Sequence, residues 1–190
     1  LTSPLFITDE RELRKMCNDA GFYPIAQQYC VLTARIERWS TVFSTSEWQE
    51  VIRHHFFVLS NMFTELLNEE NIAVAAEKDY QMVCIINLKQ SWEEFSQSIS
   101  PILLQVMEAL DTEFDISVTM ALSDLAQGLC QLPLAFLHTQ DALWYNDFLG
   151  ADRQILSYDA LNNTTHPMIH SELMELDKKL ISKLQVMDVA

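Results

Sequence analysis

The chain has 190 residues, of which 49% are hydrophobic and 21% charged, the balance of one globular domain with terminal extensions. Its 27 acidic residues outnumber 12 lysines and arginines, and the net charge of −15 should repel the phosphate backbone of nucleic acids. No apolar run approaches the about 18 residues of a membrane span, and the N-terminus lacks a secretory pattern. We therefore expect no membrane contact and a cytoplasmic location.

The first third of the chain predicts a short helix, a strand and a long helix. Residues 1–28 form a linker with one polar helix, which Gly21 is well placed to end. Residues 29–36 combine β-branched and apolar side chains, which indicates a largely buried strand. Over residues 46–67 apolar side chains recur every three or four positions, which predicts a helix with one broad apolar face.

A hairpin and a second long helix follow. Residues 72–88 form two apolar runs around a charged turn at 77–79, with no glycine or proline in either arm, as central strands prefer. Residues 91–94, Ser-Trp-Glu-Glu, have the spacing of a capping box and open a helix that extends to Leu110. Pro101 lies inside this helix, so we expect a kink or a break there.

The last elements of the domain complete the fold prediction. Residues 114–122 alternate as a strand does, Pro133 opens a third long helix that Gly150 ends, and residues 154–158 suggest an edge strand. The order strand, helix, hairpin, helix, strand, helix, short strand predicts an α+β fold. In βαββαβ form this is the ferredoxin-like arrangement, an antiparallel sheet with helices packed on one face.

The C-terminal tail carries a separate apolar stripe. The predicted division of the chain is a linker and short helix at 1–28, a domain at 29–161 and a linker helix at 162–190. The tail stripe could pack back on the domain, pair with a second copy or continue toward a following domain. Its near-heptad spacing makes these side chains the candidate interface: Ile169, Leu173, Leu176, Leu180 and Leu184.

Several side-chain sets have a structural and a chemical interpretation. His166 and His170 have the spacing of two metal ligands on one helical face, but His166 precedes a proline, so we favour a capping or solvated role. His138 with Asp141 and Cys130 lacks the spacing of a nucleophile, base and orienting group, so structural roles are favoured there as well.

Aromatic and thiol side chains are expected mainly in the core. Trp144, Tyr145 and Phe148 should seal the third long helix against the sheet, with a ligand pocket as the alternative. Cys30 and Cys84 lie in apolar strand-like runs and are expected to be buried free thiols.

The passage from 116 to 158 resembles a known family. Its segments Gln-Asp-Ala-Leu-Trp-Tyr at 140–145 and Phe-Leu-Gly at 148–150 are similar to the end of the degenerate GGDEF-like domain found in the middle of many bacterial AraC-family regulators. The resemblance covers roughly residues 29–161. It implies the fold of a diguanylate cyclase.

The resemblance also implies that the cyclase chemistry is lost. A cyclase would hold Mg²⁺ with an aspartate at the end of its first strand, since this cation requires oxygen ligands, and Ala121 stands where a glycine is expected. The glycines and paired acids of the hairpin signature are missing as well. We therefore expect no catalytic residue, no metal and no cofactor. The former active-site positions are Arg35 in place of the aspartate, Glu37, Lys78, Asp79, Tyr80 and Gln81.

The predicted function is that of a non-enzymatic regulatory domain in a two-component AraC-type transcription regulator. Its expected partners are a receiver or sensor domain before it and helix-turn-helix motifs after it in the same chain, with a homodimer as a further option. The DNA-binding part would lie beyond Ala190. The alternatives are a small-molecule or nucleotide sensor that keeps a cavity in the old nucleotide cleft, and an active cyclase.

Overall fold

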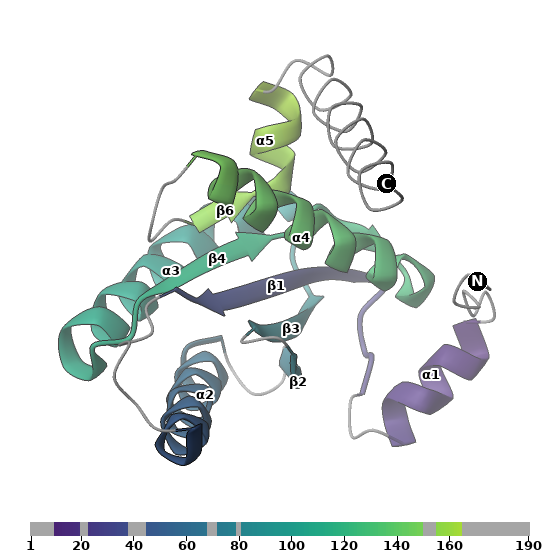
Figure 1. The fold of residues 1–190 in the computed structure, drawn as a ribbon. Helices are drawn as coiled ribbons and strands as arrows, with labels where there is room; N and C mark the ends of the chain where they lie inside the picture. The colour runs from purple at the N-terminus through teal and green to yellow at the C-terminus, as the bar shows by residue number, and fades with distance from the viewer. Residues whose placement is uncertain are drawn as a thin grey trace, which may run out of the picture. The chain divides into compact units, whose positions relative to one another are not determined.

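The computed structural model describes residues 10–19, 23–37, 45–67, 72–78, 81–149 and 155–164 (Figure 1). The chain divides into two units, Leu1–Tyr158 and Asp159–Ala190. The sheet and its helices belong to the first unit. Of the second unit the structure describes residues 159–164, which are the continuation of the last helix.

The described elements follow the predicted order, with two small additions between the fourth strand and the third long helix and a short helix directly after the last strand. They are α1 (Glu10–Asp19), β1 (Gln28–Ile36), α2 (Thr45–Leu67), β2 (Ile72–Lys78), β3 (Gln81–Leu88), α3 (Trp92–Phe114), β4 (Val118–Leu122), β5 (Ala126–Gln127), the 3-10 helix η1 (Leu129–Gln131), α4 (Leu132–Leu149), β6 (Ile155–Ser157) and α5 (Tyr158–Thr164).

The sheet has the strand order β2-β3-β1-β4-β6, and β5 pairs with β1 off this path. The pairs β2–β3, β3–β1 and β1–β4 are antiparallel, whereas β4 and β6 are parallel. The α+β class and the predicted hairpin are therefore confirmed, but the purely antiparallel sheet is wrong at β6. The reason lies in the connection: α4 carries the chain back over the sheet between β4 and β6, and such a crossover joins parallel strands.

One face of the sheet packs against α2 and α3. Alternate residues of β1, β3 and β4 join the main apolar core there, together with Phe56, Leu59 and Phe63 of α2 and Ile99, Leu103 and Val106 of α3. Burying apolar surface at about 25 cal/mol per Å² makes this face the principal source of stability. The residues that β1 contributes are Cys30, Leu32, Ala34 and Ile36.

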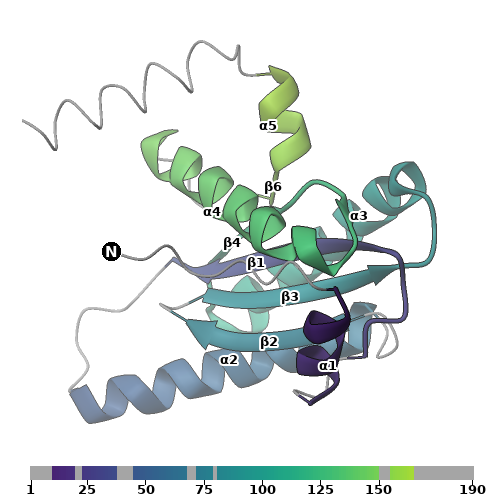
Figure 2. The ribbon, with the colours of Figure 1, turned by 90° about the vertical axis from the view of Figure 1, so that its right-hand side faces the viewer.

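The opposite face of β1 and β4 packs against α4, so the predicted single helical layer is wrong (Figures 1 and 2). The hydroxyl groups of Thr33 on β1 and Thr139 on α4 form a hydrogen bond of 2.7 Å across this contact. The strand pattern explains the second layer. Residues 29–34 of β1 are all buried, and a strand that is buried on both faces needs a cover on each.

The predicted capping box of α3 is confirmed. The Ser91 hydroxyl accepts a hydrogen bond from the Glu94 amide at 3.3 Å, and the Glu94 carboxylate accepts one from the Ser91 amide at 3.3 Å. The helix runs through Pro101 without the break that was one expected outcome. It ends at Asp115, whose left-handed backbone (φ 55°) delays the next strand to Val118, four residues later than predicted.

The aromatic prediction for α4 is wrong at Trp144, which is 50% exposed. Ala142 and Leu143 are buried instead, and Leu134 and Leu137 also face outward. Since α4 is apolar around most of its circumference, periodicity could not select the face that meets the sheet.

The thiols match expectation in the strands. Cys30 and Cys84 are buried and take part in no disulfide bond, while Cys130 is exposed. Burial raises the pKa of Cys84 to about 12, so this thiol stays protonated at neutral pH. Among the described residues, no helix combines the length and apolar character needed to cross a bilayer.

Candidate functional site

The first candidate site lies at the hairpin end of the sheet. Arg35 on β1 is in register with Gln81 on β3, and Gln81 is in register with Lys78 on β2. Three of the positions named from the resemblance therefore form one row across neighbouring strands. Glu37 follows directly after β1, and its amide donates to the Ser117 carbonyl at 2.8 Å. Asp79 and Tyr80 lie outside the described residues.

Arg35 bridges two carboxylates. Its Nε and Nη2 donate to Glu37 Oε1 at 3.0 and 2.8 Å. Its Nη1 donates to Asp147 Oδ2 at 2.9 Å, and Nη2 also donates to Asp147 Oδ1. Asp147 comes from α4, so the bridge joins the end of β1 to the helix that covers it. Nothing in the sequence pointed to Asp147, because it lies 112 residues from Arg35.

The surroundings keep Arg35 charged. Burial of the guanidinium lowers its pKa, but the hydrogen bonds that it donates to Asp147 and to Glu37 outweigh this effect, and the net pKa is raised. The Arg35 and Glu37 side chains are each 17% exposed, whereas Asp147 is 53% exposed. One positive and two negative groups leave this cluster with a single negative charge, and both carboxylates are already turned toward the guanidinium.

A neighbouring buried hydroxyl marks the same row. Thr119 on β4 is in register with Arg35 and is fully buried under α4. Among the described residues its Oγ1 has no hydrogen-bond partner. A buried hydroxyl without a partner destabilises a fold by about 1–3 kcal/mol, so the row carries a polar position that packing alone does not explain.

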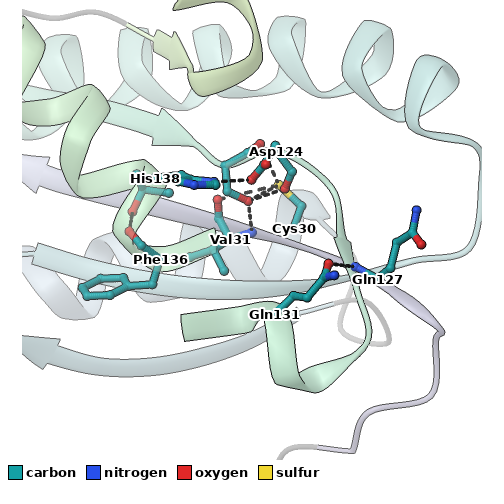
Figure 3. Close-up of polar contacts among 9 residues, drawn as sticks. Cys30, Val31, Asp124, Gln127, Gln131, Phe136 and His138 are labelled. Carbon is teal, nitrogen blue, oxygen red and sulfur yellow. Dashed lines mark hydrogen bonds and ion pairs between the residues drawn. The ribbon is translucent and has the colours of Figure 1, made fainter. Parts of the chain in front are cut away.

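A second cluster lies at the other end of α4, around His138 (Figure 3). His138 Nδ1 lies 2.7 Å from Asp124 Oδ1. The imidazole also stacks on the Tyr158 ring, with centroids 4.0 Å apart and planes inclined by 2°. The carboxylate that orients His138 is thus Asp124 in the connector after β4, rather than the Asp141 considered from the sequence.

Ser123 fixes the connector that carries Asp124. Its hydroxyl accepts from the Val31 amide at 3.0 Å and donates to the Asp124 carbonyl at 2.6 Å, next to Cys30 (Figure 3). Ser123 is fully buried, and this hydroxyl serves the backbone. Cys130 is exposed on η1. The arrangement is therefore a structural network that positions His138 and not the nucleophilic set weighed in the sequence.

The His138 cluster ties α4 to the end of the first unit. Tyr158 follows β6 directly and is the last residue of that unit. A carboxylate below one ring nitrogen and an aromatic ring against one face fix the imidazole in two directions. Movement of α4 would therefore move the ring on which Tyr158 rests.

The metal and tail predictions fall mainly on residues that the structure does not describe. No group of three or more His, Cys, Asp or Glu side chains suited to a metal ion occurs among the described residues. His166 and His170 lie outside those residues, and so does the predicted tail interface: Ile169, Leu173, Leu176, Leu180 and Leu184.

Comparison with known proteins yields structural likenesses only. No family model and no curated protein matches the chain. The active GGEEF domain of a diguanylate cyclase from Vibrio cholerae is similar in structure, with a TM-score of 0.49 and 8% identity over 79% of this chain and 92% of that chain. A diguanylate cyclase/phosphodiesterase from Caldicellulosiruptor saccharolyticus gives 0.44 and 11%, over 78% and 85%. At these TM-scores the likenesses carry no argument of their own, and the fold rests on the strand order and registers.

Proposed function

We propose that this chain is a non-catalytic, signal-transmitting domain of an AraC-type transcription regulator. It would couple a receiver or sensor domain before it to a helix-turn-helix domain after it, in the same cytoplasmic protein. The observation that carries the loss of catalysis is the bridge from Arg35 to Glu37 and Asp147. The regulatory context comes from the sequence resemblance.

The bridge disfavours a divalent cation at this end of the sheet. Mg²⁺ needs oxygen ligands in near-octahedral geometry, and Glu37 and Asp147, the two carboxylates seen beside Arg35 in the described residues, are both bound by its guanidinium. A metal would have to displace Arg35 and leave a cation of raised pKa, 17% exposed, without its partners. The geometry therefore supports a retained scaffold in which an internal ion pair has replaced a metal site.

Transmission would run through α4. This helix carries Asp147 at one end and His138 nearer the other, and Tyr158 stacks on His138 where the first unit ends. A partner domain that shifts α4 would change the position of Tyr158 and the direction in which the chain continues. This is a small rigid-body movement of a packed helix, a common form of conformational switching.

The loss of catalysis is tested by direct assay. The purified chain is incubated with GTP and Mg²⁺ or Mn²⁺, and the products are separated by chromatography. We expect no cyclic dinucleotide. Linear product formation that Glu37→Ala abolishes would contradict the proposal.

The transmitting role is tested in the longer protein with a transcriptional reporter. Tyr158→Ala removes the stack on His138, and we expect it to reduce the response to the input signal while the melting temperature of the domain changes little. Tyr23→Ala is the matched control, since Tyr23 is 67% exposed and far from α4 in sequence. An unchanged response in Tyr158→Ala would refute the coupling role of the stack.

A further inference from the structure

A cavity lies at the end of the sheet away from the hairpin turn. It has a volume of about 170 Å³ and opens between the end of α2, the end of β3 and the start of α3. Its distance from the Arg35 row is about 20 Å, because Gln81 and Asn87 are six residues apart on an extended strand. The cavity is therefore separate from the Arg35 row. Its lining residues are Leu66, Ile86, Asn87, Leu88, Lys89, Gln90, Phe95, Ser98, Ile99 and Ile102.

The floor of the cavity is apolar. Ile86, Leu88, Phe95 and Ile99 contribute to it and are each no more than 6% exposed. Engineered cavities of about 150 Å³ with Leu, Ile and Phe walls bind benzene. The space therefore suits one aromatic ring or a short branched aliphatic chain, and it is too small for a nucleotide.

The rim of the cavity presents hydrogen-bond donors. Gln90 Nε2 donates to Ser98 Oγ at 3.2 Å, and the Ser98 hydroxyl donates to the Phe95 carbonyl at 3.0 Å, so both rim side chains are held in place. A primary amide has a second N–H, and Lys89, a positively charged side chain, is also among the lining residues. A donor-rich rim over an apolar floor matches a molecule with an apolar body and a negatively charged acceptor group.

The start of α3 lies beside the same rim. Its amide groups form the positive end of the helix dipole, which favours an anion. Glu93 and Glu94 stand in this first turn, but the Glu94 carboxylate is turned back onto the Ser91 amide by the capping box. Ser91 and Glu94 thus already occupy the helix end, so an anion at the cavity mouth would be held by the side chains of the rim and not by the helix dipole.

We propose that this cavity binds a small monocarboxylic acid with one aromatic ring or a short branched carbon chain. The carbon body would rest against Ile86, Phe95 and Ile99, and the carboxylate would meet Lys89 and the Gln90 amide at the rim. Because α2 and α3 both contribute walls, occupancy would stabilise the contact between these helices by mass action. This would give the domain a chemical input beyond the signal passed on by its neighbours.

Benzoate is the probe for the test, with neutral benzyl alcohol as its charge-free counterpart. Binding to the full chain is followed by the methyl NMR signals of Ile86, Ile99 and Ile102 and by calorimetric titration. We expect saturable benzoate binding with shifts at these methyl groups. Saturation that leaves them unshifted, or no binding at all, would overturn the proposal.

Two variants separate the body from the charge. Lys89→Gln should weaken benzoate binding about fivefold, the effect of one partly exposed ion pair, and leave benzyl alcohol within about twofold. Ile102→Phe fills the cavity and should weaken both probes. Lys15→Gln, on exposed α1, is the control and should change neither. Equal weakening of both probes by Lys89→Gln would overturn the assignment of the carboxylate.

The test is independent of the proposed regulatory role. It measures binding without GTP, DNA or a partner domain, so a failure leaves the signal-transmitting role standing. Conversely, benzoate binding that meets these criteria would hold even if the reporter response proved independent of Tyr158.

Discussion

At the scale of single residues, Arg35 has the largest consequence for function. An acidic residue at this position would gather charge that only a cation could neutralise, whereas arginine neutralises Glu37 and Asp147 from within the chain. A planar guanidinium can do this bidentately, and it stays charged at any physiological pH. Arg35 thus forms a structural link between the end of β1 and α4.

Removing a carboxylate from this bridge should lower stability. Glu37→Ala leaves Arg35 with one partner at a site 17% exposed, and we expect the free energy of unfolding to fall by about 1–2 kcal/mol. The control is Glu10→Ala, which breaks the 3.4 Å ion pair between Glu10 and Arg14. Both side chains are about half exposed, so this variant should lower the free energy of unfolding by less than about 0.5 kcal/mol. Urea unfolding of both variants measures the two changes in the free energy of unfolding. Equal changes would mean that the bridge contributes no more than an exposed ion pair.

His55 makes a separate prediction on acid stability. Burial of the imidazole, and next the neighbouring His54, lower the pKa of His55, while Asp115 opposes them. The unfolded chain therefore takes up this proton near pH 6.5 and the folded chain only at lower pH, so stability falls as pH drops below 6.5.

His55→Gln should flatten this part of the stability curve. Chemical unfolding at several pH values between neutral and mildly acid measures the slope. His54→Gln is the control at an exposed neighbouring position, and it should keep most of the slope. Parallel curves for the wild-type chain and His55→Gln would show that other groups cause the acid sensitivity.

At the scale of elements, sequence patterns predicted the features that depend on residues close together in the chain. The run of β1, the hairpin and the capping box at Ser91 depend on neighbouring residues, and each was found where expected. The partners of Arg35 and His138 depend on how α4 lies on the sheet, and neither Asp147 nor Asp124 has a spacing that reveals it. The exposure of Leu134, Leu137 and Trp144 on α4 was not predicted for a related reason. Small residues such as Ala142 contact the sheet in place of these larger ones.

The two ends of α3 should respond to mutation in opposite directions. Ser91→Ala removes the cap and should lower the free energy of unfolding by about 1 kcal/mol. Asp115→Asn removes a negative charge from the negative end of the helix and keeps a residue that tolerates the left-handed conformation. We expect Asp115→Asn to raise the free energy of unfolding by about 0.3–1 kcal/mol.

Ser96→Ala, within the helix, is the control and should leave stability nearly unchanged. Thermal unfolding of all three variants gives the comparison. A destabilising Asp115→Asn would show that its carboxylate has a role beyond closing the helix.

At the scale of the whole molecule, charge and chain organisation limit the function. A net charge of −15 opposes binding of a phosphate backbone by this chain, so contact with DNA has to come from elsewhere in the proposed regulator. The sheet and its covers form one unit that ends at Tyr158, and the apolar stripe of the tail follows in the other. In the proposed regulator, the signal would pass through the contacts that these terminal segments make.

The tail stripe is where this requirement can be tested. Leucines at near-heptad spacing gain stability when they are buried together, so we expect the chain to associate through them. Sedimentation velocity should show a concentration-dependent assembly that Leu176→Glu with Leu180→Glu disrupts. Lys178→Glu adds a negative charge about 200° around a predicted helix from Leu176 and is the matched control. If the double variant changes neither sedimentation nor the melting temperature, the stripe buries nothing in this chain, and the prediction that the chain associates through it would be wrong.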